Sequence, residues 1–159
     1  MARIGFAREA ARKLVRKAGM VSPPVDVFEL AKSNGFSVYR REFSEELSGV
    51  LLNHADLKAI GVNARQAYVR QRFTLAHELG HYMLGHEDSL YVDIDDPTFD
   101  HSDDLEREAN EFAAELLMPL HMLKQDARKG FTRDIEGLAR RYQVGQQALW
   151  LRLLDSKLV

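Results

Sequence analysis

Three residues within a five-residue segment are of types that bind metal ions and transfer protons. The segment His77-Glu78-Leu79-Gly80-His81 has the pattern H-E-x-x-H. On a helix, side chains four positions apart lie one turn apart on the same face, so both imidazoles can reach a single ion. Neutral imidazole suits zinc, and Glu78 beside the ion is placed to act as a general base on water. The pattern therefore predicts the site of a zinc metallopeptidase, with His77 and His81 as ligands and Glu78 as the catalytic residue.

A catalytic zinc site usually has three protein ligands, so a third must come from another element. Glu106 and Glu108 on the next predicted helix are the main candidates. At about 100° per residue, Glu106 falls at the border of the apolar face of that helix, whereas Glu108 falls outside Phe112. Asn110, one turn after Glu106, can accept a hydrogen bond from the non-metal nitrogen of a ligand histidine. We predict Glu106 as the third ligand and keep Glu108 as the alternative.

The composition limits the alternatives. The chain has 159 residues, 45% of them hydrophobic, which is enough for one domain with a core. It contains no cysteine, so disulfides, thiolate nucleophiles and cysteine-bound zinc are excluded. The formal net charge of −2 argues against direct nucleic-acid binding. Neither a signal peptide nor a membrane-spanning run is recognisable, so we expect a cytoplasmic protein.

Hydrophobic periodicity divides the chain into segments that are successively helical, extended and helical. We expect a single metallopeptidase domain over residues 1–159, with N-terminal helices in 1–35 and a small antiparallel sheet in 36–63. The active-site and ligand helices then occupy 70–119, and a helical tail occupies 120–159. The expected strands are 36–39, 49–52 and 59–63, with a hairpin loop at 53–56. The expected helices cover residues 6–18, 27–35, 70–84, 103–118, 132–142 and 146–154; residues 86–102 are expected to form a functional loop or lid, and 121–127 a short turn.

Two longer segments of the sequence resemble a known family. Residues 72–82, which contain the H-E-x-x-H pattern, and residues 106–119 together are similar to the ImmA/IrrE metallopeptidases. In the wider gluzincin group the third ligand is a Glu in an E-x-x-x-D/N context, which Glu106 and Asn110 match. The resemblance implies an α+β, zincin-like fold that is mostly helical, with a small antiparallel sheet packed on the active-site helix. It also implies one Zn²⁺ per chain and a cytoplasmic endopeptidase that cleaves a helix-turn-helix transcriptional repressor.

Several points stay open at the level of sequence. Tyr82, His86, Tyr91 and His101 are all near the site in sequence, and the spacing does not select an oxyanion donor among them. Other H-E-x-x-H peptidases suggest that the substrate binds as an extended strand at an edge of the sheet. The tail also fits a degenerate helix-turn-helix, so a DNA-binding or partner-binding regulatory module is one alternative function. A metal-binding scaffold that has lost peptidase activity and holds a partner is another.

Overall fold

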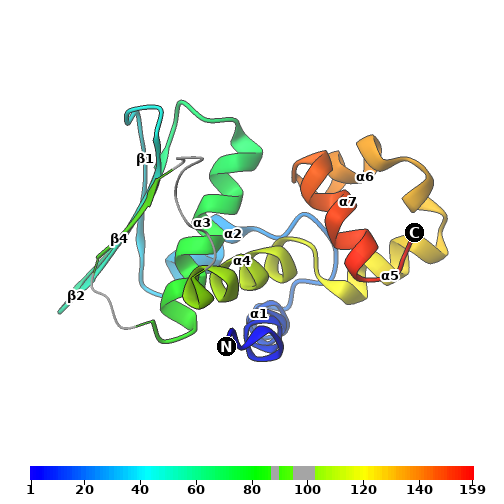
Figure 1. The fold of residues 1–159 in the computed structure, drawn as a ribbon, viewed down its shortest axis with the longest axis horizontal. Coiled ribbons are helices and arrows are strands. Elements are labelled where there is room, and N and C mark those ends of the chain that lie inside the picture. The colour runs from blue at the N-terminus through cyan, green and yellow to red at the C-terminus, as the bar shows by residue number, and fades with distance from the viewer. Residues whose placement is uncertain (87–89, 95–102) are drawn as a thin grey trace.

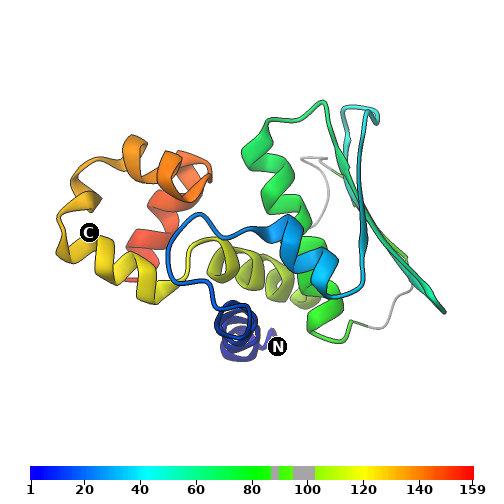
Figure 2. The ribbon, with the colours of Figure 1, turned by 180° about the vertical axis from the view of Figure 1, so that it is seen from behind.

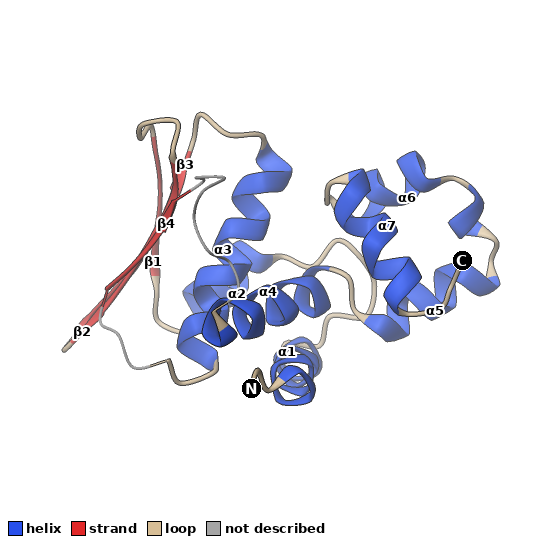
Figure 3. Cartoon of the chain, viewed as in Figure 1, coloured by secondary structure: helices blue, strands red, loops and turns tan. Residues whose placement is uncertain are grey.

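The active-site helix predicted from the sequence lies between a small sheet and a layer of helices (Figures 1 and 3). The structure is a computed structural model, and it describes residues 1–86, 90–94 and 103–159. The α+β class is confirmed. In chain order the elements are α1 (Ile4–Lys17), α2 (Val27–Ser33), β1 (Ser37–Arg41), β2 (Leu47–His54), β3 (Leu57–Asn63), α3 (Tyr68–Met83), β4 (Leu90–Ile94), α4 (Asp104–Leu117), α5 (Leu120–Arg128), a 3-10 turn (Phe131–Arg133), α6 (Ile135–Tyr142) and α7 (Gln146–Asp155).

The sheet is mixed, with strand order β1-β3-β2-β4. Strands β2 and β3 form the expected antiparallel hairpin, whose turn includes Ala55 at a φ of 51°. Strand β1 pairs with β3 in parallel, so the prediction of a purely antiparallel sheet was wrong. The reason is that β3 lies between β1 and β2, and the chain after β1 has to pass the end of β3. The buried Asn63 side chain, at that end, accepts a hydrogen bond from Phe43 N and donates to Ser44 O and Leu47 O, which fixes this connection.

Strand β4 was not expected, because residues 86–102 lack a sustained period. It pairs antiparallel with β2 at the edge of the sheet, and Leu90 and Val92 are exposed. Most of the predicted lid, residues 87–89 and 95–102, lies outside the described residues. The predicted turn at 121–127 is instead the helix α5, which begins directly after Pro119.

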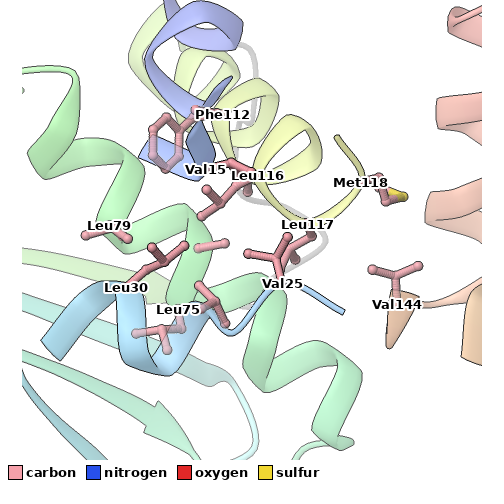
Figure 4. Packing of buried hydrophobic residues seen from close by; sticks show 14 of the residues in the cluster. Val15, Val25, Leu30, Leu75, Leu79, Phe112, Leu116, Leu117, Met118 and Val144 are labelled. Atoms are coloured by element: carbon pink, nitrogen blue, oxygen red, sulfur yellow. The ribbon is translucent and has the colours of Figure 1, made fainter. Parts of the chain in front are cut away.

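The core joins α3 to elements on both of its sides. Viewed from either face, α2 and α4 lie against α3, and α1 lies beneath α4 (Figures 1 and 2). Figure 4 shows Leu75 and Leu79 of α3 packed among Leu30 of α2, and Phe112 and Leu116 of α4. Burial of such apolar side chains is the main force that holds α3 in position.

The C-terminal helices α5–α7 form a cluster at the far end of α4 (Figure 1). The buried guanidinium of Arg72 on α3 ties this cluster to the active-site half. It donates hydrogen bonds to the carbonyl oxygens of Tyr142, Gln143 and Val25. Through these contacts the tail packs against the α3 half of the molecule.

Candidate metal centre

A glycine inside the H-E-x-x-H segment sets the distance between α3 and α4. A Cβ atom at Gly80 would lie 2.9 Å from Cδ1 of Phe112 and 3.3 Å from the carbonyl oxygen of Ala109. Such distances leave no room for a side chain, so the backbones of the two helices approach closely there. This approach brings the first turns of α4, with Glu106 and Asn110, over the histidines of α3.

The three predicted ligand side chains converge. The Nε2 atoms of His77 and His81 lie 3.2 Å apart, and Glu106 places its Oε2 3.0 Å from the first and its Oε1 2.9 Å from the second. The two histidine side chains are buried, whereas that of Glu106 is 20% exposed. Around a tetrahedral zinc with bonds of about 2.0–2.1 Å, neighbouring ligand atoms lie roughly 3.3 Å apart. The observed separations are close to that value.

The hydrogen bonds of His77 determine which of its nitrogens can hold a metal ion. Its Nδ1 lies 2.8 Å from Oδ1 of Asn110, and an amide oxygen only accepts hydrogen bonds. In the neutral ring Nδ1 therefore carries the hydrogen, and Nε2 presents a lone pair to the carboxylate of Glu106. Lone pairs that face each other at this distance repel unless a cation lies between them. The donor set of two imidazoles and a carboxylate thus fits a divalent cation.

The environment also controls the charges of these groups. Burial lowers the pKa of His81, which favours the neutral form that binds metals. Burial by itself raises the pKa of Glu106, but the contacts with His77 and His81 outweigh it and hold that pKa below its ordinary range. The site therefore combines two imidazole rings with one carboxylate, a donor set that suits a cation of charge +2.

Glu78 comes from the same helix as the histidines and lies under the sheet. Its side chain is buried, and a Cβ atom at Gly49 of β2 would lie 3.8 Å from Cγ of Glu78 and 2.4 Å from Cγ2 of Thr74. The glycine lets β2 lie directly on α3 at this point. The carboxyl group that we predict to be the general base is thus enclosed between the helix and the strand.

Glu108, the alternative third ligand, lies elsewhere. Its carboxylate accepts hydrogen bonds from Arg3 N, Nε and Nη2, and its Oε2 lies 3.0 Å from Nε2 of His86. These hydrogen bonds, chiefly those of the Arg3 side chain, lower the pKa of Glu108 to about 2. The sequence placed Glu108 outside the apolar arc, yet it is only 2% exposed. The arc is wider than the sequence suggested because α4 packs against α1 as well as α3.

Two of the four candidate oxyanion donors make other contacts. The hydroxyl group of Tyr82 lies 2.9 Å from Nζ of Lys58 on β3, and its ring packs edge-on against Phe36. His86 contacts His81 and Glu108. The side chain of Tyr91 and the whole of His101 lie outside the described residues.

The chain also matches known proteins. Residues 31–154 match the family model Peptidase_M78, described as the IrrE N-terminal-like domain. The chain belongs to this family. Peptidase_M78 is a metallopeptidase family, so membership confirms the resemblance seen in the sequence and implies a metal.

One known protein resembles this chain in sequence and another in structure. An uncharacterized immunity region protein 2 of Bacillus phage phi105 is 29% identical over 127 residues, which cover 80% of this chain and 77% of the phage protein. A solved structure described as a Mycobacterium tuberculosis transcriptional regulator superposes with a TM-score of 0.64 at 21% identity. The match covers 93% of this chain but only 55% of that structure, and at this identity it supports the fold alone.

Within the part of the chain that the structure describes, no helix has the length and apolar character needed to cross a bilayer.

Proposed function

We propose that this Peptidase_M78 chain is a zinc-dependent endopeptidase that hydrolyses a peptide bond in a helix-turn-helix transcriptional repressor. The observation that carries the proposal is the convergence of His77 Nε2, His81 Nε2 and the Glu106 carboxylate within mutual reach, with Glu78 on the same helix. Two histidines and a glutamate are the ligands of a catalytic zinc site that keeps one position open for water or substrate.

In this proposal, His77, His81 and Glu106 hold one zinc ion. When bound, zinc acts as a Lewis acid that polarises the scissile carbonyl and lowers the pKa of water from 15.7 to about 7. Glu78 accepts the proton of the attacking water and passes it to the nitrogen of the leaving amine, so that the amine departs as a neutral group. Asn110 keeps His77 in the tautomer that presents Nε2 to the centre.

The choice of substrate draws on a relative and on the sheet. The relative is named for a phage immunity region, which favours a repressor as the protein that is cleaved. Strand β4 is the edge strand next to β2, and an extended segment of substrate can add to a sheet edge through backbone hydrogen bonds. A repressor acts where the DNA is, so the proposal includes a cytoplasmic location.

We further propose that residues 1–159 work as one metallopeptidase domain. One continuous cluster of buried apolar residues extends from Ala7 in α1 to Leu153 in α7. The two halves therefore share a core, and the tail serves as part of the catalytic domain in this proposal.

The experiment combines metal analysis with a cleavage assay. The purified protein should contain about one zinc per chain, and His77→Ala should lose it. The protein is then incubated with the helix-turn-helix repressor encoded nearest to its gene, and the products are read by mass spectrometry. Glu78→Gln should keep its zinc and lose cleavage by at least about 100-fold, the lower range of general-base catalysis. Cleavage by Glu78→Gln at the wild-type rate would refute the mechanism, and a zinc-loaded wild type that cleaves no repressor would favour the inactive scaffold.

A further inference from the structure

A chain of hydrogen bonds extends from His81 away from the metal centre. Nδ1 of His81 lies 2.7 Å from Nδ1 of His86, and Nε2 of His86 lies 3.0 Å from Oε2 of Glu108. Arg3 completes the chain, because its Nε and Nη2 donate to the two carboxylate oxygens of Glu108 at 3.0 and 2.9 Å. The side chains of His86 and Glu108 are 1% and 3% exposed, so their contact with each other is shielded from water, whereas the side chain of Arg3 is 51% exposed.

The C-terminal end of α3 places His86 in this chain. Gly85 adopts a φ of 72°, a left-handed conformation that glycine adopts without steric cost. The amide of Gly85 donates to Tyr82 O and the amide of His86 donates to His81 O, which is the pattern of a Schellman cap. The backbone of His86 is thereby tied to the residue that its side chain contacts, and its ring turns back under that of His81.

The direction of these hydrogen bonds follows from Glu108. An ionised carboxylate only accepts, so Nε2 of His86 must donate to it. In a neutral His86 ring, Nδ1 then carries a lone pair and must accept. The hydrogen between the two rings consequently belongs to Nδ1 of His81, and Nε2 of His81 is left with the lone pair that faces Glu106. A charge on α4, 22 residues from His86 in sequence, thus selects the tautomer of His81.

We propose that His86, Glu108 and Arg3 are positioning residues that hold His81 in the tautomer and orientation required of a metal ligand. This inference rests on the proposed function in one respect, that His81 binds the metal ion. The two ligand histidines then differ: His77 is held by a neutral amide, whereas His81 is held through a second imidazole that ends at an arginine-paired carboxylate. Hydrogen bonds of this kind fix the ring and raise the basicity of the ligand nitrogen.

The first test uses metal-free protein, so it is independent of peptidase activity. In protein labelled with ¹⁵N at histidine, the couplings of the His81 ring nitrogens at pH 8 should identify a single Nδ1–H tautomer. His86→Phe and Glu108→Ala should give mixed or inverted tautomers. Glu108→Gln should restore the wild-type pattern, because its amide oxygen can still accept from His86. If His86→Phe and Glu108→Ala leave the His81 tautomer unchanged, the inference is wrong.

The second test measures zinc affinity by competition with a chromophoric chelator. His86→Phe and Glu108→Ala should each weaken zinc binding by about 10- to 100-fold, and the double variant should be little weaker than either single one, because both act through the same chain. The matched control is Glu111→Ala. Glu111 also joins α4 to α1, through Arg8 Nε at 3.0 Å, but has no contact with His86 among the described hydrogen bonds. It should bind zinc as the wild type does.

The outcomes separate the two proposals. Unchanged affinity in Glu108→Ala, with His77→Ala unable to bind zinc, would overturn the positioning role and leave the metal site standing. Wild-type protein that binds no zinc but shows the expected tautomers would overturn the proposed function and the role of His81 as a ligand, and would leave standing the control of its tautomer by His86 and Glu108. An equal loss in Glu111→Ala would mean that the docking of α1 matters and the chain of hydrogen bonds does not. If Glu108→Ala fails to fold, His86→Phe provides the same two measurements.

Discussion

Two carboxylates on α4, nine residues apart, occupy opposite ends of the helix and meet different partners. Glu115 is completely buried and forms ion pairs with Arg12 and with Arg152, and it also accepts a hydrogen bond from Leu120 N. Glu106 is 20% exposed, and the ion-pair partners that the structure gives it are the imidazoles of two histidines. Burial lowers the pKa of Arg152 to about 10, which leaves the guanidinium charged at neutral pH.

The two carboxylates differ in the charge of the groups that surround them. At Glu115 the chain supplies two permanent cations, so the charge is balanced within the fold and the cluster joins α1, α4 and α7. At Glu106 the partners that the structure describes are two imidazole rings, neither of which is a permanent cation, so we propose a bound metal ion as the balancing charge. We therefore expect Glu115 to matter for folding and Glu106 to matter for binding a cation.

The largest effect should come from Glu115→Ala. Removing this carboxylate leaves Arg152, whose side chain is 5% exposed, as an uncompensated buried charge. Breaking a buried pair in this way costs about 3–5 kcal/mol of the free energy of unfolding. Urea unfolding followed by circular dichroism measures it. Glu111→Ala, which removes the partly exposed pair with Arg8, should cost no more than about 1 kcal/mol. Similar losses in both variants would show that the buried ion pairs of Glu115 contribute no more to stability than the partly exposed pair of Glu111.

A second effect of similar size should depend on zinc. At free zinc about 1,000-fold above its dissociation constant, a site that only the folded state possesses adds about 4 kcal/mol of stability. Addition of a chelator should remove that increment from the wild type. Glu106→Gln should unfold at the same denaturant concentration as the metal-free wild type and should gain much less from zinc. A Glu106→Gln variant that is strongly destabilised without metal would place Glu106 in the same structural class as Glu115.

Gly80→Ala should have an intermediate effect. The added methyl group would meet the Phe112 ring at 2.9 Å, and overpacking of this kind costs about 1–3 kcal/mol. It should also weaken zinc binding, because α4 carries Glu106. Gly5→Ala in α1 is the control: no atom lies within 4 Å of the added methyl, so the better helix propensity of alanine should stabilise the protein by about 0.5–1 kcal/mol.

The smallest effect should arise at Tyr142 and depend on pH. Its hydroxyl group donates to Asp126 Oδ2 at 2.8 Å, and burial, followed by this hydrogen bond, raises its pKa above the ordinary value. Tyr142→Phe should cost about 1 kcal/mol near neutral pH. A raised pKa contributes stability that is complete below the unfolded pKa near 10 and is lost above it. The difference between wild type and variant, from urea unfolding, should therefore shrink by about 0.8 kcal/mol from pH 8 to pH 10.5. If the difference in free energy of unfolding grew with pH instead, the pKa of Tyr142 would not be raised in the folded state.

Local patterns were sufficient for the parts of the fold that depend on neighbours in sequence. The helical period placed α1, α3 and α4 almost at their observed limits, and the spacing of His77 and His81 predicted their convergence. The angular position of Glu106 on its helix predicted that its side chain faces inward, and it lies against the same two histidines. These results follow from helix geometry, which acts over a few residues.

The remaining features depend on contacts between distant segments. The parallel pairing of β1 with β3 is not visible in either strand alone, and β4 is an edge strand without a clear alternation. His86 and Glu108 each have the appearance of a surface residue, and only the packing of α1 on α4 buries them together. From the sequence, His86 was a candidate oxyanion donor only; its place directly after the glycine that ends the active-site helix is the local signal for its contact with His81.

The contact at Gly49 has a consequence for how this molecule can vary. The enclosed carboxyl of Glu78 rests against a strand of the sheet, whereas the side chains that would hold the metal ion are braced by α4 and by the cap of α3. In the proposed function, proton transfer by Glu78 and metal affinity thus depend on different neighbouring elements. We expect substitutions in the sheet to alter the rate of hydrolysis more than the affinity for the ion, and substitutions in α4 to alter the affinity more than the rate, so that the two properties can evolve separately.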